Sequence, residues 1–160
     1  MGILTKSNLV LRDIDLFQRF EDIEVGVTVN SFEGKIKRDV EAFSPTNEKR
    51  IDALKTLFEN EIKTYAFVSP IIPGLTDVEK IIEETKSFVN FYWFEFLNLR
   101  ASGKEFRKWL IEKCPESNEI LANKEKMEKF VKKTVETIKN SKIKVRSVCI
   151  HYPKLESLKF

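Results

Sequence analysis

The sequence has few of the residues that build metal centres and disulfide frameworks. Its 160 residues include two cysteines, Cys114 and Cys149, and one histidine, His151. The cysteines form no CxxC pair and match no zinc-ligand spacing, and a single histidine excludes a histidine-rich metal site. Two unpaired thiols are typical of a reducing compartment, so we predict a cytoplasmic protein.

Long apolar runs and a strong excess of charge are also missing. No run approaches the ~20 apolar residues of a membrane-spanning helix, so we expect no membrane partner. The opening residues lack the apolar region and cleavage site of a secretory signal peptide. The net charge is +3, from 28 basic and 25 acidic residues, which is too balanced to indicate nucleic-acid binding by itself.

Glycine and proline are scarce, with five of each, and no Pro/Gly/Ser-rich linker or internal repeat interrupts the chain. We therefore predict a single domain over residues 1–160. Apolar runs rich in β-branched and aromatic residues predict strands, and 3.6-residue periodicity predicts helices. The predicted strands cover 3–5, 23–31, 63–72, 91–99 and 143–153. The predicted helices cover 48–60, 76–88, 102–114 and 123–142.

This alternation favours an α/β fold with parallel strands joined by right-handed crossovers. The strands are nearly continuous in apolar residues, as expected when both faces of a sheet are covered. Two architectures fit the pattern, namely part of a (β/α) barrel and a small doubly wound sheet. In both, ligands bind at the carboxyl ends of the strands.

Polar residues stand at several of these predicted carboxyl ends. They could hold a polar, partly anionic ligand, since an ammonium suits a carboxylate or phosphate and hydroxyls suit a nucleoside. The alternative is that polar residues merely mark the ends of strands. The residues concerned are Thr5, Lys6, Ser7, Asn30, Ser31, Ser69, Pro70, Glu95, Asn98 and Arg100.

A series of segments between residues 3 and 103 resembles one branch of a known enzyme family. The segments are TKS, LVLRDIDLF, VGVTVNS, VEAFSPTNEKRIDALKTL, YAFVSPIIPGLTD and FEFLNLRASG. In this order they are similar to radical S-adenosylmethionine enzymes of the spore photoproduct lyase and DNA-repair-photolyase-like branch. The resemblance implies a partial (β/α) barrel: the C-terminal half of a radical-SAM-type, TIM-like barrel with parallel strands and flanking helices.

Members of this family bind a [4Fe-4S] cluster through a CxxxCxxC motif, cleave S-adenosylmethionine and generate a 5′-deoxyadenosyl radical. The motif is absent from this sequence, and Cys114 and Cys149 cannot replace three closely spaced thiolates. We therefore expect the isolated chain to bind no cluster and to be inactive alone. An iron–sulfur absorbance band after reconstitution would contradict this expectation.

The resemblance also implies a set of cofactor-binding residues. Lys6 and Ser31 match positions that hold the methionyl group or the ribose of S-adenosylmethionine, and Ser69 lies beside the adenine or ribose. Glu41 and Arg50 match a paired acid and base, for which a simple salt bridge at the entry of a helix is the alternative. The full predicted set is Lys6, Asn30, Ser31, Arg50, Ser69 and, as an acid facing the barrel lumen, Glu95.

Three other features favour structural roles. The aromatic residues of 91–96 could stack on bases, but burial in a core strand explains them more simply. The lysine-rich helix 123–142 is better explained as a solvated helix face than as a membrane or phosphate site. His151 follows the last strand without an obvious partner, which favours a structural histidine.

Two further functions stay open at the sequence level. The chain could be a non-catalytic α/β binding or assembly module that dimerises through exposed strand edges. It could also be a small nucleotide-binding domain unrelated to the radical enzymes. The expected partners are the missing N-terminal half of the barrel or a second copy of the chain, with nucleic acid reached only through the complete enzyme.

Overall fold

The structure is a computed structural model that describes residues 1–152. The strands of this range are β1 (Gly2–Thr5), β2 (Glu24–Val29), β3 (Lys63–Ile71), β4 (Phe91–Phe96) and β5 (Val145–Cys149). The helices are η1 (Asn8–Asp13), α1 (Ile14–Phe17), α2 (Gly34–Glu41), α3 (Asn47–Glu59), α4 (Val78–Thr85), α5 (Lys104–Lys113), α6 (Pro115–Ala122) and α7 (Lys124–Asn140). Residue 153, the last of the predicted strand 143–153, lies outside the described range.

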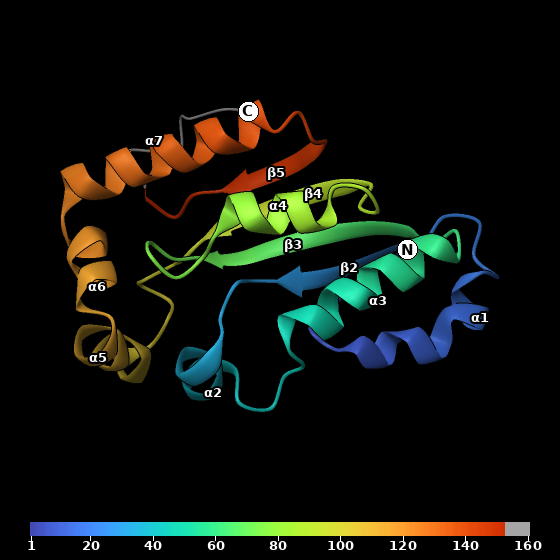
Figure 1. Cartoon of the computed structure of the whole chain (residues 1–160), viewed down its shortest axis with the longest axis horizontal. Coiled ribbons are helices and arrows are strands. Elements are labelled where there is room, and N and C mark those ends of the chain that lie inside the picture. The colour runs from blue at the N-terminus through green and yellow to red at the C-terminus, as the bar shows by residue number, and fades with distance from the viewer. Residues whose placement is uncertain (153–160) are drawn as a thin grey trace.

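The five described strands form one parallel sheet in the order β1-β2-β3-β4-β5. Helices α3, α4 and α7 lie on one side of it (Figure 1). A sheet that follows chain order through right-handed crossovers places its connections on a single face. A doubly wound sheet reverses its strand order at a switch point instead, so the described strands exclude that predicted alternative.

Side-chain hydrogen bonds at helix starts explain where several helices begin. Thr46 caps α3 and Asp77 caps α4, each accepting from a backbone N–H three residues later. Pro115 occupies the first position of α6, where its missing N–H costs nothing.

The core lies between the sheet and its helices. Val25, Val27 and Val29 of β2 are fully buried and alternate with residues of the opposite face. Tyr92, Phe94 and Phe96 of β4 are buried in the same way, which confirms a core role for this half of the aromatic strand. The helices contribute Leu54, Leu57, Ile81, Ile82, Val131 and Ile138.

The opposite face is also rich in aromatic residues, but it is less buried than the expectation of two covered faces implies. Alternation places Tyr65, Phe67, Trp93 and Glu95 on this face, and Trp93 is 39% exposed. Strand β4 is therefore core on one face and partly exposed on the other. We call this second face the open face.

The open face is concave. Arg146 of β5 donates to Glu24 of β2 at 2.5 and 2.9 Å, although β3 and β4 lie between these strands. In a flat sheet β2 and β5 would be about 14 Å apart. Because side chains stand roughly perpendicular to a sheet, a contact across this separation requires the sheet to curve toward the open face.

Aromatic side chains cover the part of this concave face where the strands begin. Tyr65 crosses β2 at Gly26, donates from its hydroxyl to the Ile3 carbonyl at 3.1 Å, and stacks on Phe91 at 5.1 Å. The Arg146 guanidinium lies 3.7 Å above the Phe91 ring. We call Glu24, Gly26, Tyr65, Phe91 and Arg146 the floor. The opposite end, where the strands finish, holds the predicted site residues.

Candidate functional site

A cluster of charged side chains lies where β1 and β2 end. Lys6 follows β1, and Glu41 is the last residue of α2, the helix that follows β2. Glu41 accepts from Lys6 Nζ at 2.6 Å, from Arg50 Nη2 at 2.5 Å and from Lys37 Nζ at 3.2 Å. Three cations thus surround one carboxylate, and we call these four residues the Glu41 cluster.

Arg50 is the buried anchor of the cluster. Its side chain is fully buried, and it donates to the backbone carbonyls of Pro45 and Thr28 at 3.1 and 3.3 Å. It also donates to Ser44 Oγ at 2.7 Å. The salt bridge predicted as one alternative for Glu41 and Arg50 is therefore present. It joins α3 to the end of α2, and the hydrogen bond to the Thr28 carbonyl joins α3 to β2.

Lys6 differs from the other cations because its side chain is 51% exposed. An ammonium has three N–H donors, and Glu41 accepts one of them. The hydrogen bond to Glu41 holds the Lys6 ammonium in place. The cluster also has a net positive charge, because it contains three cations and one carboxylate. Lys6 can therefore receive an anionic group at the carboxyl end of β1.

The pKa values of Glu41 and Lys37 in the cluster are both lowered, for different reasons. Burial alone raises the pKa of Glu41, but the hydrogen bonds and charges of Lys6 and Arg50 outweigh it and lower the pKa to about 2. Burial lowers the pKa of Lys37, and the Glu41 carboxylate opposes that effect. Glu24 of the floor also has a pKa of about 2, because Arg146 and Lys63 donate to it.

These shifts predict a loss of stability in acid. Glu41 and Glu24 have folded-state pKa values of about 2, below the ordinary value of 4.5. Their contribution is complete above pH 4.5 and disappears as the pH falls toward 2, because protonation ends the pairing. Urea denaturation across this range should show the midpoint falling, and Glu24→Gln should flatten the fall. A midpoint that stays constant below pH 4.5 would contradict the ion-pair assignment.

Asn30 and Ser31 follow β2, and they differ in whether the polar atoms of their side chains have hydrogen-bond partners. Ser31 Oγ donates to the Leu75 carbonyl at 3.2 Å and accepts from the Asp77 N–H at 2.6 Å, which ties the loop before α4 to β2. Asn30 is 1% exposed and its Oδ1 accepts from the Phe32 N–H. Its Nδ2 is buried without a partner among the described residues. An orphaned donor is costly, which favours an oxygen-bearing ligand at this position.

A second polar group lies where β3, β4 and β5 end. Glu95 Oε2 accepts from Ser69 Oγ at 2.7 Å, and Glu95 Oε1 lies 3.0 Å from His151 Nε2. Ser69 is buried, whereas the side chains of Glu95 and His151 are about one-third exposed. We call Ser69, Glu95 and His151 the Glu95 triad.

The sequence did not indicate the histidine of this triad. His151 contacts Glu95, which lies 56 residues earlier in the sequence, so the prediction of a histidine without a partner is wrong. The position of His151 directly after β5 could have predicted the contact, because the carboxyl ends of parallel strands meet at one edge of the sheet.

The remaining polar residues at strand ends serve local structure. Thr5 Oγ1 accepts from the Ser7 N–H, and Ser7 caps η1. Asn98 Oδ1 accepts from the Ala101 N–H, and the Arg100 carbonyl accepts from Arg107. For Thr5, Ser7 and Asn98 the side-chain contacts support the alternative that polar residues mark strand ends.

Two features that are absent from residues 1–152 bear on the class of site. No group of three or more His, Cys, Asp or Glu side chains there is arranged to hold a metal ion. No helix in the same range combines the length and apolar character that crossing a membrane requires.

Comparison with known proteins identified relatives without an assigned activity. An uncharacterized protein of Methanocaldococcus jannaschii is 59% identical over 151 residues, which is 94% of this chain and 58% of that protein. Uncharacterized proteins of Mycobacterium tuberculosis and Mycobacterium bovis are 31% identical over 80 residues, or 24% of their length. The chain thus spans little more than half of the archaeal relative and a quarter of the mycobacterial ones. No family model and no solved structure matches.

Proposed function

We propose that this chain is the C-terminal portion of a radical S-adenosylmethionine enzyme and forms one wall of its barrel. A parallel sheet in chain order, with helices on one face and a concave opposite face, is the geometry of a barrel wall. The observation that carries the proposal is Lys6. Its half-exposed ammonium is held at the carboxyl end of β1 by a buried carboxylate.

The residues at this edge fit the polar groups of S-adenosylmethionine. Lys6 would pair with the methionyl carboxylate, and the orphaned Asn30 amide would donate to an oxygen of the cofactor. Ser31 and Ser69 would lie near the nucleoside, with Glu95 accepting from a ribose hydroxyl or an amino group. Arg50 would act through Glu41, since its guanidinium is buried against protein atoms.

The cysteines of this chain do not fit the [4Fe-4S] cluster of the family. Cys114 is buried, Cys149 is exposed on β5, and these two thiols of the sequence are fewer than the three that the cluster motif supplies. The cluster, which supplies the electron for cleavage of S-adenosylmethionine, would be held by another part of the barrel. Substrate choice, including DNA lesions, would also depend on that part, and the cytoplasm is the proposed location.

Lys6→Ala tests the proposal with two nucleoside ligands, of which one carries a carboxylate. S-adenosylmethionine carries a methionyl carboxylate, and 5′-methylthioadenosine keeps the nucleoside but lacks it. Loss of a charge-assisted contact should weaken S-adenosylmethionine binding by about tenfold or more and leave 5′-methylthioadenosine binding unchanged. Calorimetric or NMR titration measures both affinities.

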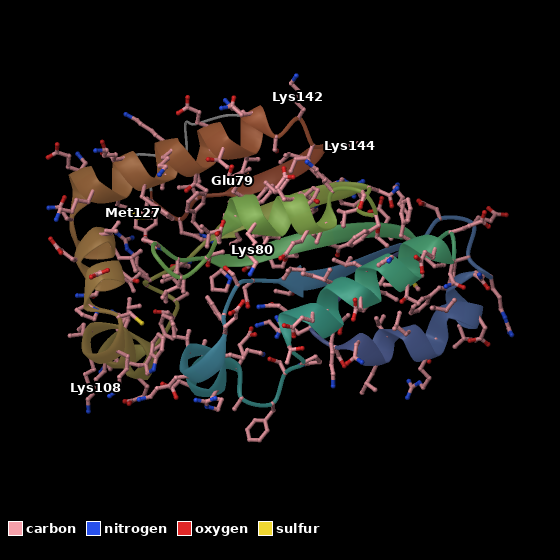
Figure 2. All side chains as sticks on the ribbon, in the orientation of Figure 1. Glu79, Lys80, Lys108, Met127, Lys142 and Lys144 are labelled. Atoms are coloured by element: carbon pink, nitrogen blue, oxygen red, sulfur yellow. The ribbon has the colours of Figure 1, made fainter. Side chains whose placement is uncertain are left out.

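Lys108→Ala is the matched control, because Lys108 projects from α5 away from the strand ends (Figure 2). It should leave both affinities unchanged. Equal S-adenosylmethionine affinity in wild type and Lys6→Ala would refute the role of Lys6. Absence of binding by the wild-type chain at millimolar ligand would refute the proposed site in this chain.

A second candidate function is an assembly module that pairs through its sheet edges. In the described sheet β1 and β5 are edge strands, which present unpaired backbone groups. Sedimentation separates the candidates, since a tight dimer supports the module. A monomer that aggregates on its exposed apolar face supports a barrel portion.

A further inference from the structure

The Glu95 triad has a geometry that the cofactor proposal does not require. Glu95 uses one carboxylate oxygen for Ser69 and the other for His151. Both partners can donate, so the arrangement suits an ionised carboxylate. When His151 donates from Nε2, its Nδ1 carries the free lone pair of the neutral ring.

We propose that the Glu95 triad is a proton-transfer site on the open face, with His151 Nδ1 as the group that takes the proton. Its ligand would be a weak acid that loses a proton from carbon, nitrogen or oxygen. The proton would pass to Nδ1, the ligand would keep the electron pair, and the imidazolium would be stabilised by Glu95 at 3.0 Å.

The surroundings of the imidazole are those of a site open to a ligand. The His151 side chain is 28% exposed and that of Glu95 is 34% exposed. Trp93, two residues before Glu95 on the same face, offers a partly exposed apolar surface. Titratable neighbours are Cys149, paired in register with Glu95, and Tyr152, whose hydroxyl donates to the Leu97 carbonyl.

Ser69 and Glu95 are positioning residues in this proposal. Ser69 is buried and holds one oxygen of Glu95, which leaves the other directed at His151. Glu95 in turn fixes the ring and selects Nε2 as the protonated nitrogen. The proposal needs neither S-adenosylmethionine nor a cluster, so it can fail or succeed independently of the proposed function.

The test uses 5-nitrobenzisoxazole, a flat probe whose ring opens when a base removes its C–H proton. The proton passes to the base, the C–H electron pair forms the nitrile, and the N–O bond breaks to leave a phenolate. Wild-type protein should accelerate this reaction above buffer, and His151→Gln should lower the excess rate about tenfold or more. Glu112→Gln, an exposed position on α5, is the control and should leave the rate unchanged.

Imidazole rescue separates positioning by Glu95 from a structural role. In His151→Gly, added imidazole should restore the rate with saturation, because Glu95 binds the free base in the vacated position. In His151→Gly/Glu95→Gln, the rate should rise linearly without saturation. NMR supplies a direct check, since the sequence has one histidine and its Nε2-bound proton should exchange slowly only while Glu95 is present.

Two results would overturn the proposal. One is an equal rate in wild type and His151→Gln when both variants give the spectrum of a folded chain. The other is equal imidazole rescue with and without Glu95. Either result would assign the triad to structure alone, whatever the outcome of the S-adenosylmethionine titration.

Discussion

Replacing Glu41 with alanine is expected to destabilise the fold by about 3–5 kcal/mol, because it leaves Arg50 and Lys37 as uncompensated cations. The Arg50 side chain is fully buried and that of Lys37 is 12% exposed, so water cannot replace the lost carboxylate. Urea denaturation followed by circular dichroism measures the change as a lower midpoint at unchanged slope.

Glu59→Ala is the matched control. Glu59 is also the last residue of a helix, and its ion pair with Lys55 is long at 4.0 Å and more than half exposed. Its loss should change the midpoint little. The double variant Glu41→Ala/Arg50→Met should recover part of the loss, since it removes the buried charge. An equal urea midpoint for Glu41→Ala and Glu59→Ala would contradict the claim that the Glu41 cluster stabilises the fold.

The second large effect concerns the floor of the open face. Gly26→Ala should destabilise the chain by about 1–3 kcal/mol, because the new Cβ would lie 2.1 Å from the Tyr65 ring. The ring cannot move freely, since it stacks on Phe91 and its hydroxyl donates to the Ile3 carbonyl. The same denaturation experiment measures this change.

A double-mutant cycle with Tyr65→Leu tests the cause. If the Cβ acts through the ring, Gly26→Ala should cost much less in the Tyr65→Leu background than in the wild type. If the free-energy changes of the two single variants add in the double variant, Gly26 is needed for another reason, such as its backbone conformation.

The strands were predictable because their signal is local. Phe91–Phe96 and Lys63–Ile71 lie inside the predicted ranges 91–99 and 63–72, since β-branched and aromatic runs bounded by turn residues are typical of strands. Helix α7 was predictable for the same kind of reason, through its long 3.6-residue period.

Among the helices that were not predicted, α2 and α6 were missed for different physical reasons. Helix α2 is eight residues long and has only two apolar residues, Ile36 and Val40, which share one face but are too few to predict a helix. Helix α6 begins at Pro115, the residue directly after the predicted helix 102–114. A proline both ends one helix and suits the first turn of another.

The site was predictable by position but not by pairing. Parallel strands bring their carboxyl ends to one edge, which is why Lys6, Asn30, Ser69 and Glu95 all lie near strand ends. The pairings of Lys6 with Glu41 and of Glu95 with His151 join residues distant in sequence. These pairings depend on the packing of α2 beside β1 and on the pairing of β5 with β4. Local sequence patterns do not specify such long-range contacts.

The central claim is that the carboxyl ends of the strands, on the concave face, form the ligand site. Backbone NMR of the isotope-labelled chain titrated with S-adenosylmethionine tests it most directly. Amide signals of residues 5–7, 30–31, 69 and 95–97 should shift. Shifts confined to the opposite side of the sheet, around Glu79 and Lys80 of α4, would contradict it (Figure 2).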